Sequence, residues 1–117
     1  MSAMDIDIRT FGELKVLKIK GRITLGAGVD RLRNTFDELL AVGSNRWVLD
    51  VSEVGMIDSS GIGLLVRYLT AVKQQGGALK LLNPTKFALQ SLKMIGLLNL
   101  FEVFEDQDTA VSSFVER

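Results

Sequence analysis

The chain has 117 residues, 47% of them hydrophobic, which predicts one domain over residues 1–117 with a sizeable core. Its 14 basic and 14 acidic side chains cancel, which argues against direct nucleic-acid binding, since such proteins usually carry a basic surface. The chain has no cysteine and no histidine, which excludes disulfides, thiolate nucleophiles, the Ser-His-Asp triad and most transition-metal sites.

The first elements in chain order are predicted to form a β-hairpin. Ile6 and Ile8 alternate with charged residues, and Met4 continues this alternation toward the amino terminus. Residues 11–13 indicate a turn, and residues 14–20 indicate a second strand, antiparallel to the first. A glycine-rich connection is expected over residues 21–28.

A helix and a buried strand are predicted next. The helix ends at Gly43, a typical stop, and its apolar residues share one face: Val29, Leu32, Phe36, Leu39 and Leu40. Residues 47–51 form an apolar run without alternation, which is typical of a strand covered on both faces. A second helix is expected over residues 59–75, closed by Gly76 and Gly77, with an apolar face of Ile62, Leu65, Val66, Leu69 and Val72.

The carboxyl-terminal third continues the alternation of strands and helices. Residues 78–82 predict a strand, and Asn83 and Pro84 predict the start of a third helix, as its N-cap and first residue. That helix ends at Gly96, and its expected apolar side is Phe87, Ala88, Leu92 and Ile95. Residues 101–104 predict a last strand, and Asp106 or Asp108 caps a terminal helix that buries Ala110, Val111 and Phe114.

The resulting order is β-β-α-β-α-β-α-β-α. Strands that alternate with helices favour a parallel sheet, and here only the first strand is expected to be antiparallel. The sequence therefore predicts an α/β fold with a mostly parallel five-stranded sheet and about four helices.

The most informative run is residues 54–63, Val-Gly-Met-Ile-Asp-Ser-Ser-Gly-Ile-Gly. It puts Asp58, Ser59 and Ser60 in a glycine-flanked turn at a predicted helix start, where unpaired N–H groups and the positive end of the helix dipole gather. The simplest interpretation is an N-cap, since Asp and Ser are favoured caps. Gly61 and Gly63, however, each cost a helix roughly 1 kcal/mol relative to Ala. A packed element or a partner protein is therefore expected close to this backbone, and for Gly63 both explanations stay open.

Two nucleotide-binding patterns fit the sequence poorly. Gly26 and Gly28 lie between a strand and a helix, as in a dinucleotide fingerprint, but Arg31 occupies the third glycine position. Asp50 lies at about the distance of a ribose-binding acid but not in the usual setting, so a turn into a helix is the preferred interpretation. No phosphate-binding Gly-x-x-x-x-Gly-Lys-Ser/Thr loop occurs.

Two reactive-residue hypotheses also fail. Ser59 is not in a nucleophile elbow, because Ile57 rather than glycine stands two residues before it and no histidine is available as the base. Asp50 stands where a response-regulator receiver carries its phosphoacceptor, but the acidic pair that holds magnesium in receivers is missing. Asp50 is instead predicted to end its strand and to cap or position the following loop.

Taken in order, strand 47–51, the Asp58–Gly63 run, Gly76-Gly77 and strand 78–82 resemble the STAS domains of bacterial anti-sigma factor antagonists. The likeness continues through the third helix to the last strand and covers essentially the whole chain. It implies a non-enzymatic protein without a cofactor of its own, which a partner phosphorylates on Ser59. Asp58, Ser60 and Gly61 shape the loop around that serine.

The resemblance also implies the partners. An anti-sigma factor serine kinase, which brings its own ATP and magnesium, binds the unphosphorylated antagonist and so releases a sigma factor. Phosphorylation blocks this binding, and a PPM-type phosphatase restores it. The sequence shows no secretory signal and no apolar run near the ~18 residues of a membrane span, so the cytoplasm is expected. The oligomeric state is left open.

The chain departs from the family pattern at one place. Family members often have acidic residues after the glycine that ends the second strand, where this chain has Arg22 and Thr24. In the family that segment contributes to kinase contact, so Arg22 and Thr24 join Ile62 and Gly63 as candidate partner-binding residues. The alternative is a STAS scaffold or regulatory subunit of a stress-sensing or transporter-associated complex, whose serine is never phosphorylated. A small enzyme or nucleotide binder is a third, less favoured alternative.

Overall fold

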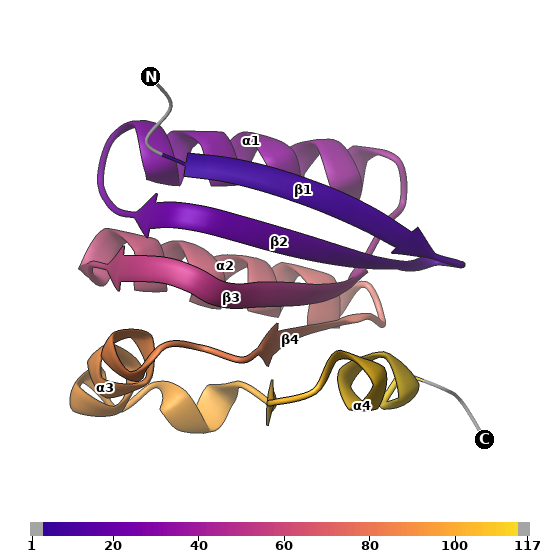
Figure 1. The fold of residues 1–117 in the computed structure, drawn as a ribbon. Coiled ribbons are helices and arrows are strands. Elements are labelled where there is room, and N and C mark those ends of the chain that lie inside the picture. Colours follow the sequence, from indigo (N-terminus) through magenta and orange to yellow (C-terminus); the bar gives the residue numbers. More distant parts are fainter. Residues whose placement is uncertain (1–3, 115–117) are drawn as a thin grey trace.

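The computed structural model describes residues 4–114, which contain one five-stranded sheet with its strands in sequence order (Figure 1). Strands β1 and β2 are antiparallel, and every later neighbour pair is parallel, which confirms the predicted topology. The strands are β1 (Met4–Phe11), β2 (Leu14–Ile23), β3 (Arg46–Ile57), β4 (Ala78–Leu82) and β5 (Val103–Phe104).

The helices cover both faces of the sheet. Helices α1 and α2 lie behind the sheet in Figure 1, and α4 lies at its other side, near the carboxyl end. Their bounds are α1 (Ala27–Ala41), α2 (Ser59–Gln74), α3 (Lys86–Ile95) and α4 (Gln107–Ser112), with a 3-10 turn η1 (Leu98–Leu100) after α3.

The larger core holds α1 and α2 against the sheet. Phe36 of α1 stacks on Trp47 of β3, with ring centroids 4.8 Å apart, and contacts the Tyr68 ring of α2 at 4.9 Å. The Tyr68 hydroxyl donates a hydrogen bond to Asp37 of α1, and burial together with this bond raises the pKa of Tyr68. Aromatic packing and this bond therefore join the two helices that begin at the site described below.

The second face carries a smaller core. Leu14, Val16, Val48 and Leu82 pack there with Ala110 of α4, while Val111 and Phe114 are only half buried. Lys80 points to this face and is buried; its Nζ donates to Ser113 Oγ at 2.9 Å and lies 3.3 Å from Glu102 Oε2. The buried ammonium is thus paired, and it ties α4 to the sheet.

The strands before the two helices are longer than predicted. β2 continues to Ile23 and β3 to Ile57, and these two residues are register partners. The connection predicted over residues 21–28 is therefore only residues 24–26, and the strand predicted over residues 47–51 continues through residues 52–57. Asp50 lies within β3 instead of ending it, and its Oδ1 accepts from the Ser52 N–H at 3.1 Å. Ladder pairing between β2 and β3 overrides the local preference of these glycine-containing segments for loops.

The third helix begins later than predicted. Asn83 has φ +56° and lies in a bend after β4, and Thr85 is the N-cap, accepting from the Ala88 N–H at 3.2 Å. Its hydroxyl also donates to the Val54 carbonyl at 3.1 Å, so a contact with β3 decides where α3 starts. Among the four residues predicted to face the core, Ala88 and Leu92 are buried, whereas Phe87 is 71% exposed and Ile95 49%.

Three smaller details of the element boundaries also emerge. The last strand is β5 (Val103–Phe104) rather than residues 101–104, because residues 98–100 form η1 before it. Asp106, not Asp108, caps α4, accepting from the Thr109 N–H at 2.9 Å. Helix α2 ends at Gln74, one residue earlier than predicted.

Candidate functional site

Asp58 joins three segments at the carboxyl ends of β2 and β3. Its Oδ1 accepts from the Gly61 N–H at 2.9 Å, which caps α2, and its Oδ2 accepts from the Leu25 N–H at 2.9 Å. Its own N–H donates to the Ile23 carbonyl at 3.3 Å. One side chain therefore holds the start of α2 and the loop between β2 and α1 in a fixed relation.

The same contacts favour the ionised carboxylate. Desolvation of Asp58 by itself raises its pKa, but hydrogen bonds from the backbone N–H groups of Leu25, Gly61 and Ser60 outweigh it, so the pKa lies below the usual 3.8. Asp58 is therefore a charged cap near neutral pH, at the helix end where the dipole favours an anion.

Ser59 is the first residue of α2, and its side chain is exposed; Ser60 is half buried. Neither hydroxyl has a hydrogen-bond partner among residues 4–114. The predicted position of Ser59 at a helix start is confirmed, with one refinement. Asp58 is the cap, which leaves both serine hydroxyls free of that task.

Gly61 is required by packing. A Cβ at this position would lie 2.1 Å from the Ile23 carbonyl oxygen and 2.9 Å from side-chain atoms of Ile23 and Ile57. The packed element expected near Gly61 is therefore the end of β2, which holds the first turn of α2 against the sheet.

Gly63 has no such neighbour. A Cβ there would meet no heavy atom within 4 Å in the described part of the chain, and Gly63 is exposed one turn after Ser59. Packing within the domain therefore does not explain this glycine, which leaves partner approach as the open alternative. Gly55, exposed near the end of β3, is equally unobstructed.

The other candidate partner-binding residues lie at the same end of the sheet. Arg22 is exposed and is the register partner of Met56 at the end of β3. Thr24 is half buried in the β2–α1 loop, next to the Leu25 N–H that Asp58 binds. Ile62 is 2% exposed and belongs mainly to the core.

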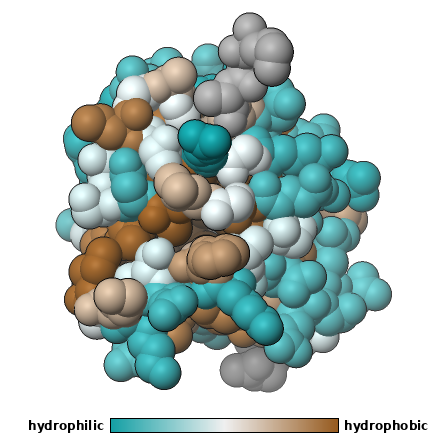
Figure 2. Space-filling model, turned by 60° about the vertical axis from the view of Figure 1, so that its left-hand side comes forward, coloured by the Kyte–Doolittle hydropathy of each residue, from teal (hydrophilic) through white to brown (hydrophobic). Residues whose placement is uncertain are grey.

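A groove that the sequence did not indicate runs beside Ser59. It has a volume of about 220 Å³, and its walls come from the start of α2 and the far end of α3: Ile57, Asp58, Ser59, Ile62, Ser91, Met94 and Ile95. The α3 residues were missed because that helix was expected to turn Ile95 inward. Figure 2 turns this end of the molecule forward and shows apolar side chains gathered in its lower left half. Ser59 therefore stands at the border of an exposed apolar surface.

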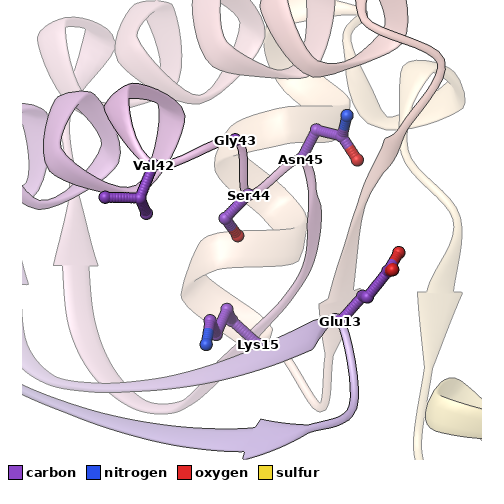
Figure 3. A pocket seen from close by; sticks show the side chains of 6 residues that line it. All are labelled: Glu13, Lys15, Val42, Gly43, Ser44 and Asn45. Atoms are coloured by element: carbon purple, nitrogen blue, oxygen red, sulfur yellow. The ribbon is translucent and has the colours of Figure 1, made fainter.

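The opposite end of the parallel strands has a different character. A hollow of about 330 Å³ lies there between the start of β2 and the α1–β3 loop (Figure 3). Its polar side chains do not converge: Glu13 and Asn45 point away from Lys15 and Ser44 in Figure 3. Asn45 donates to the Gln75 carbonyl and Ser44 accepts from Trp47, so both serve the fold.

Residues 4–114 contain no group of three His, Cys, Asp or Glu side chains arranged to hold a metal ion. No helix in that range combines the length and the apolar character that crossing a membrane requires.

Comparison with known proteins places the chain in a family. Residues 6–102 match the family model described as "Mlab, STAS domain". A protein from Thermotoga neapolitana, named as a candidate anti-sigma factor antagonist, is 31% identical over 70 residues; the match covers 60% of this chain and 62% of the relative, less than two thirds of its length.

Solved structures share the fold. An anti-sigma factor antagonist from Mycobacterium paratuberculosis superimposes with a TM-score of 0.84 at 16% identity, over 97% of this chain and 95% of that one. The phosphorylated form of the Bacillus cell fate determinant SpoIIAA gives 0.74 at 18% identity, over 93% and 98%. At these identities the likeness concerns the fold.

Proposed function

Because this chain belongs to the STAS domain family over residues 6–102, we propose that it is an anti-sigma factor antagonist switched by phosphorylation of Ser59. In its unphosphorylated form it binds an anti-sigma factor serine kinase, and this binding releases a sigma factor for transcription. The kinase supplies ATP and magnesium, and a PPM-type phosphatase removes the phosphate. The chain itself acts by binding, not by catalysis.

The observation that carries this proposal is the exposed Ser59 hydroxyl on the first residue of a rigidly capped helix. A kinase needs a hydroxyl that it can reach without unfolding its substrate, and Ser59 needs no rearrangement to be reached. Ser60, which is half buried, offers its hydroxyl less openly.

Phosphorylation changes the charge of this surface more than it disturbs the fold. A phosphate adds about −1.5 to −2 charges. The N-terminus of α2 tolerates an anion, because its N–H groups and dipole favour negative charge. A partner packed on the same surface meets a new charge that is desolvated or placed against like charge, which costs several kcal/mol. The phosphate therefore blocks docking and leaves the domain folded.

Gly63 supports a surface that a partner approaches closely. It lies on the same exposed side of α2 as Ser59, and no contact within residues 4–114 requires a glycine there. A partner that packs flat against the first two turns of α2 benefits from a missing side chain. Arg22 and Thr24, at the same end, then influence which partner binds.

The test combines the cognate anti-sigma factor kinase with wild type, Ser59→Ala and Ser59→Asp, and with Ser60→Ala as the matched control. Wild type and Ser60→Ala gain one phosphate from ATP and magnesium, mapped by mass spectrometry to residue 59. Ser59→Ala gains none but still binds the kinase by calorimetry. Ser59→Asp binds roughly a hundredfold more weakly, because of the charge mismatch described above.

Thermal unfolding of each variant shows whether weakened binding has a structural cause. Ser59→Asp is expected to be as stable as wild type, since an acidic residue suits the first helical position. If the kinase leaves Ser59 unmodified and Ser59→Asp binds as tightly as wild type, the switch is wrong.

The basic and neutral residues at Arg22 and Thr24 favour a second candidate, a STAS scaffold or regulatory subunit whose serine is not phosphorylated. Intact mass of the protein purified from its native host, before and after phosphatase treatment, separates the two. An extra mass of about 80 Da, the mass of one phosphate group, that disappears after phosphatase treatment supports the switch. A protein that is unmodified under all growth conditions supports the scaffold.

A further inference from the structure

Helix α3 presents apolar side chains to solvent on the side away from the core. Phe87 is 71% exposed, Met94 79% and Ile95 49%, and Leu100, the last residue of η1, is 45% exposed. Next to them lies a shallow groove of about 670 Å³ along the outside of α3 and η1, lined by Lys86, Leu89, Gln90, Lys93, Met94 and Leu98. Met94 belongs to both the exposed apolar residues and the groove lining, and exposed apolar surface beside a groove indicates a place that another molecule covers.

Helix α3 lies in a basic stretch of the sequence, and the charged residues that line the groove are Lys86 and Lys93. Residues 59–101 contain Arg67, Lys73, Lys80, Lys86 and Lys93 and no acidic residue, although the whole chain is neutral. Lys80 is buried and paired with Glu102, whereas the other four are exposed. Neither Lys86 nor Lys93 has a carboxylate within ion-pair distance among residues 4–114. The groove is therefore lined by apolar side chains together with two lysines that have no acidic partner in the described part of the chain.

The groove adjoins the Ser59 site. Met94 lines both the outer groove and the smaller groove that Ser59 borders. A partner that meets Ser59 is thus positioned to cover α3 as well, without a second, separate interface.

We propose that this α3 groove, lined by Lys86, Leu89, Gln90, Lys93, Met94 and Leu98, binds an amphipathic helix of the partner that has an apolar stripe flanked by Asp or Glu. An occupant of about three turns matches α3, whose ten residues span roughly 15 Å. Apolar residues of that helix, spaced i, i+3, i+4 and i+7, fill the groove, and its carboxylates face the two lysines. The inference rests on the proposed function in one respect: it takes the helix to belong to the partner that docks at Ser59.

A second copy of this chain fits the groove less well. The acidic residues of the chain lie outside residues 59–101. Helix α1 carries three of them, Asp30, Asp37 and Glu38, but its apolar face is buried against its own sheet. A copy therefore offers acidic charge without a free apolar stripe. An anionic membrane also supplies negative charge and apolar matter, and vesicles are therefore included in the experiment below.

The experiment titrates the isotope-labelled protein with two synthetic 14-residue helical peptides and follows backbone amide shifts. Both peptides carry the same leucine stripe, and their flanking positions are Glu in one and Lys in the other. The Glu peptide is expected to shift Leu89, Met94 and Leu98 and to bind roughly tenfold more tightly at low salt than the Lys peptide, because the two lysines attract it instead of repelling it.

Two charge-reversed variants locate the effect. Lys86→Glu/Lys93→Glu is expected to reverse the peptide preference. Arg67→Glu/Lys73→Glu changes the net charge equally on α2, away from the groove, and keeps the wild-type preference. A preference that both variants lose equally contradicts a specific groove and indicates general attraction by net charge.

Other outcomes overturn the proposal. Equal binding of both peptides, or shifts outside α3 and η1, shows that no acidic helix is selected. Sedimentation with phosphatidylcholine/phosphatidylglycerol vesicles without peptide binding assigns the surface to lipid, and concentration-dependent dimerisation that protects the groove assigns it to a second copy. The peptides do not involve Ser59, so a failed kinase assay with successful peptide binding removes the proposed function and keeps the groove, and the reverse result does the opposite.

Discussion

The first turns of α1 and α2 lie against consecutive residues of β2, and they are held there in different ways. In both, a helical glycine meets a backbone carbonyl of β2: a Cβ at Gly28 would lie 2.4 Å from the Arg22 oxygen, and one at Gly61 would lie 2.1 Å from the Ile23 oxygen. Only α2 has a side-chain cap, because Gly26 precedes α1 and Asp58 precedes α2. Close packing alone is enough to start a helix at this sheet edge.

The difference between the two helix starts shows what the Asp58 cap contributes. Asp58 holds α2 through its own first turn and also holds the β2–α1 loop at Leu25. The residue after the cap, Ser59, therefore stays exposed on a backbone that is fixed from two sides. In α1 the first turn is held by packing at Gly28, without a side-chain cap.

The largest effect is expected from the two packed glycines. Gly61→Ala and Gly28→Ala each force a Cβ into a backbone carbonyl, so each is expected to lower the free energy of unfolding by about 3 kcal/mol or to prevent folding. Urea unfolding followed by circular dichroism measures this. If either variant is as stable as wild type, the close approach of that helix to β2 is incorrect.

Loss of the Asp58 cap should destabilise the protein less than either glycine substitution. Asp58→Ala removes both hydrogen bonds of the carboxylate and is expected to lower the free energy of unfolding by about 2 kcal/mol. The matched change on α1 is Asp30→Ala, which removes an exposed ion pair with Arg33 and is expected to cost less than about 0.5 kcal/mol. Equal losses in the two variants would erase the difference between the helix starts.

Gly63→Ala should stabilise the fold, unlike the substitutions above. The new methyl group enters open space and removes the flexibility of glycine from the helix, which is expected to raise the free energy of unfolding by roughly 0.5–1 kcal/mol. The same variant is expected to bind the kinase more weakly if the partner packs against this turn. A more stable protein with undiminished binding would remove Gly63 from the interface.

Acidification probes the charge of the cap and should produce the smallest effect. The folded pKa of Asp58 lies below its ordinary 3.8, so the ionised carboxylate stabilises the fold above that pH, and this stabilisation is lost as the pH falls through the lower folded pKa. Between about pH 6 and about pH 2.5, wild type is expected to lose more stability than Asp58→Asn, whose cap does not titrate. Parallel unfolding curves at both pH values would contradict a charged cap.

Much of the fold was predictable because the patterns are local. The spacing of Val29, Leu32 and Phe36 identified the buried face of α1, and the run Trp47–Leu49 identified a strand covered on both faces; all are buried. The helix start at Ser59 was predictable for the same reason, since a cap, its serines and the apolar spacing that follows are neighbours in sequence.

The errors arose where a distant segment decides the local structure. β3 continues to Ile57 because β2 pairs with it, although its glycine and polar residues favour a loop. Likewise, α3 begins at Lys86 because the Thr85 hydroxyl reaches the Val54 carbonyl. Phe87 and Ile95 look like core residues in sequence, since an apolar side chain at helical spacing has the same pattern whether or not an element covers it.

By itself, then, the sequence determined the order of the elements, the family resemblance and the placement of Ser59 at the start of a helix. Only the tertiary structure separated Gly61 from Gly63, because the two glycines differ in what lies opposite them and not in their local context. It also decided that one apolar side of α3 faces solvent. Such facts depend on surfaces that meet through the fold, and periodicity along the chain carries no information about them.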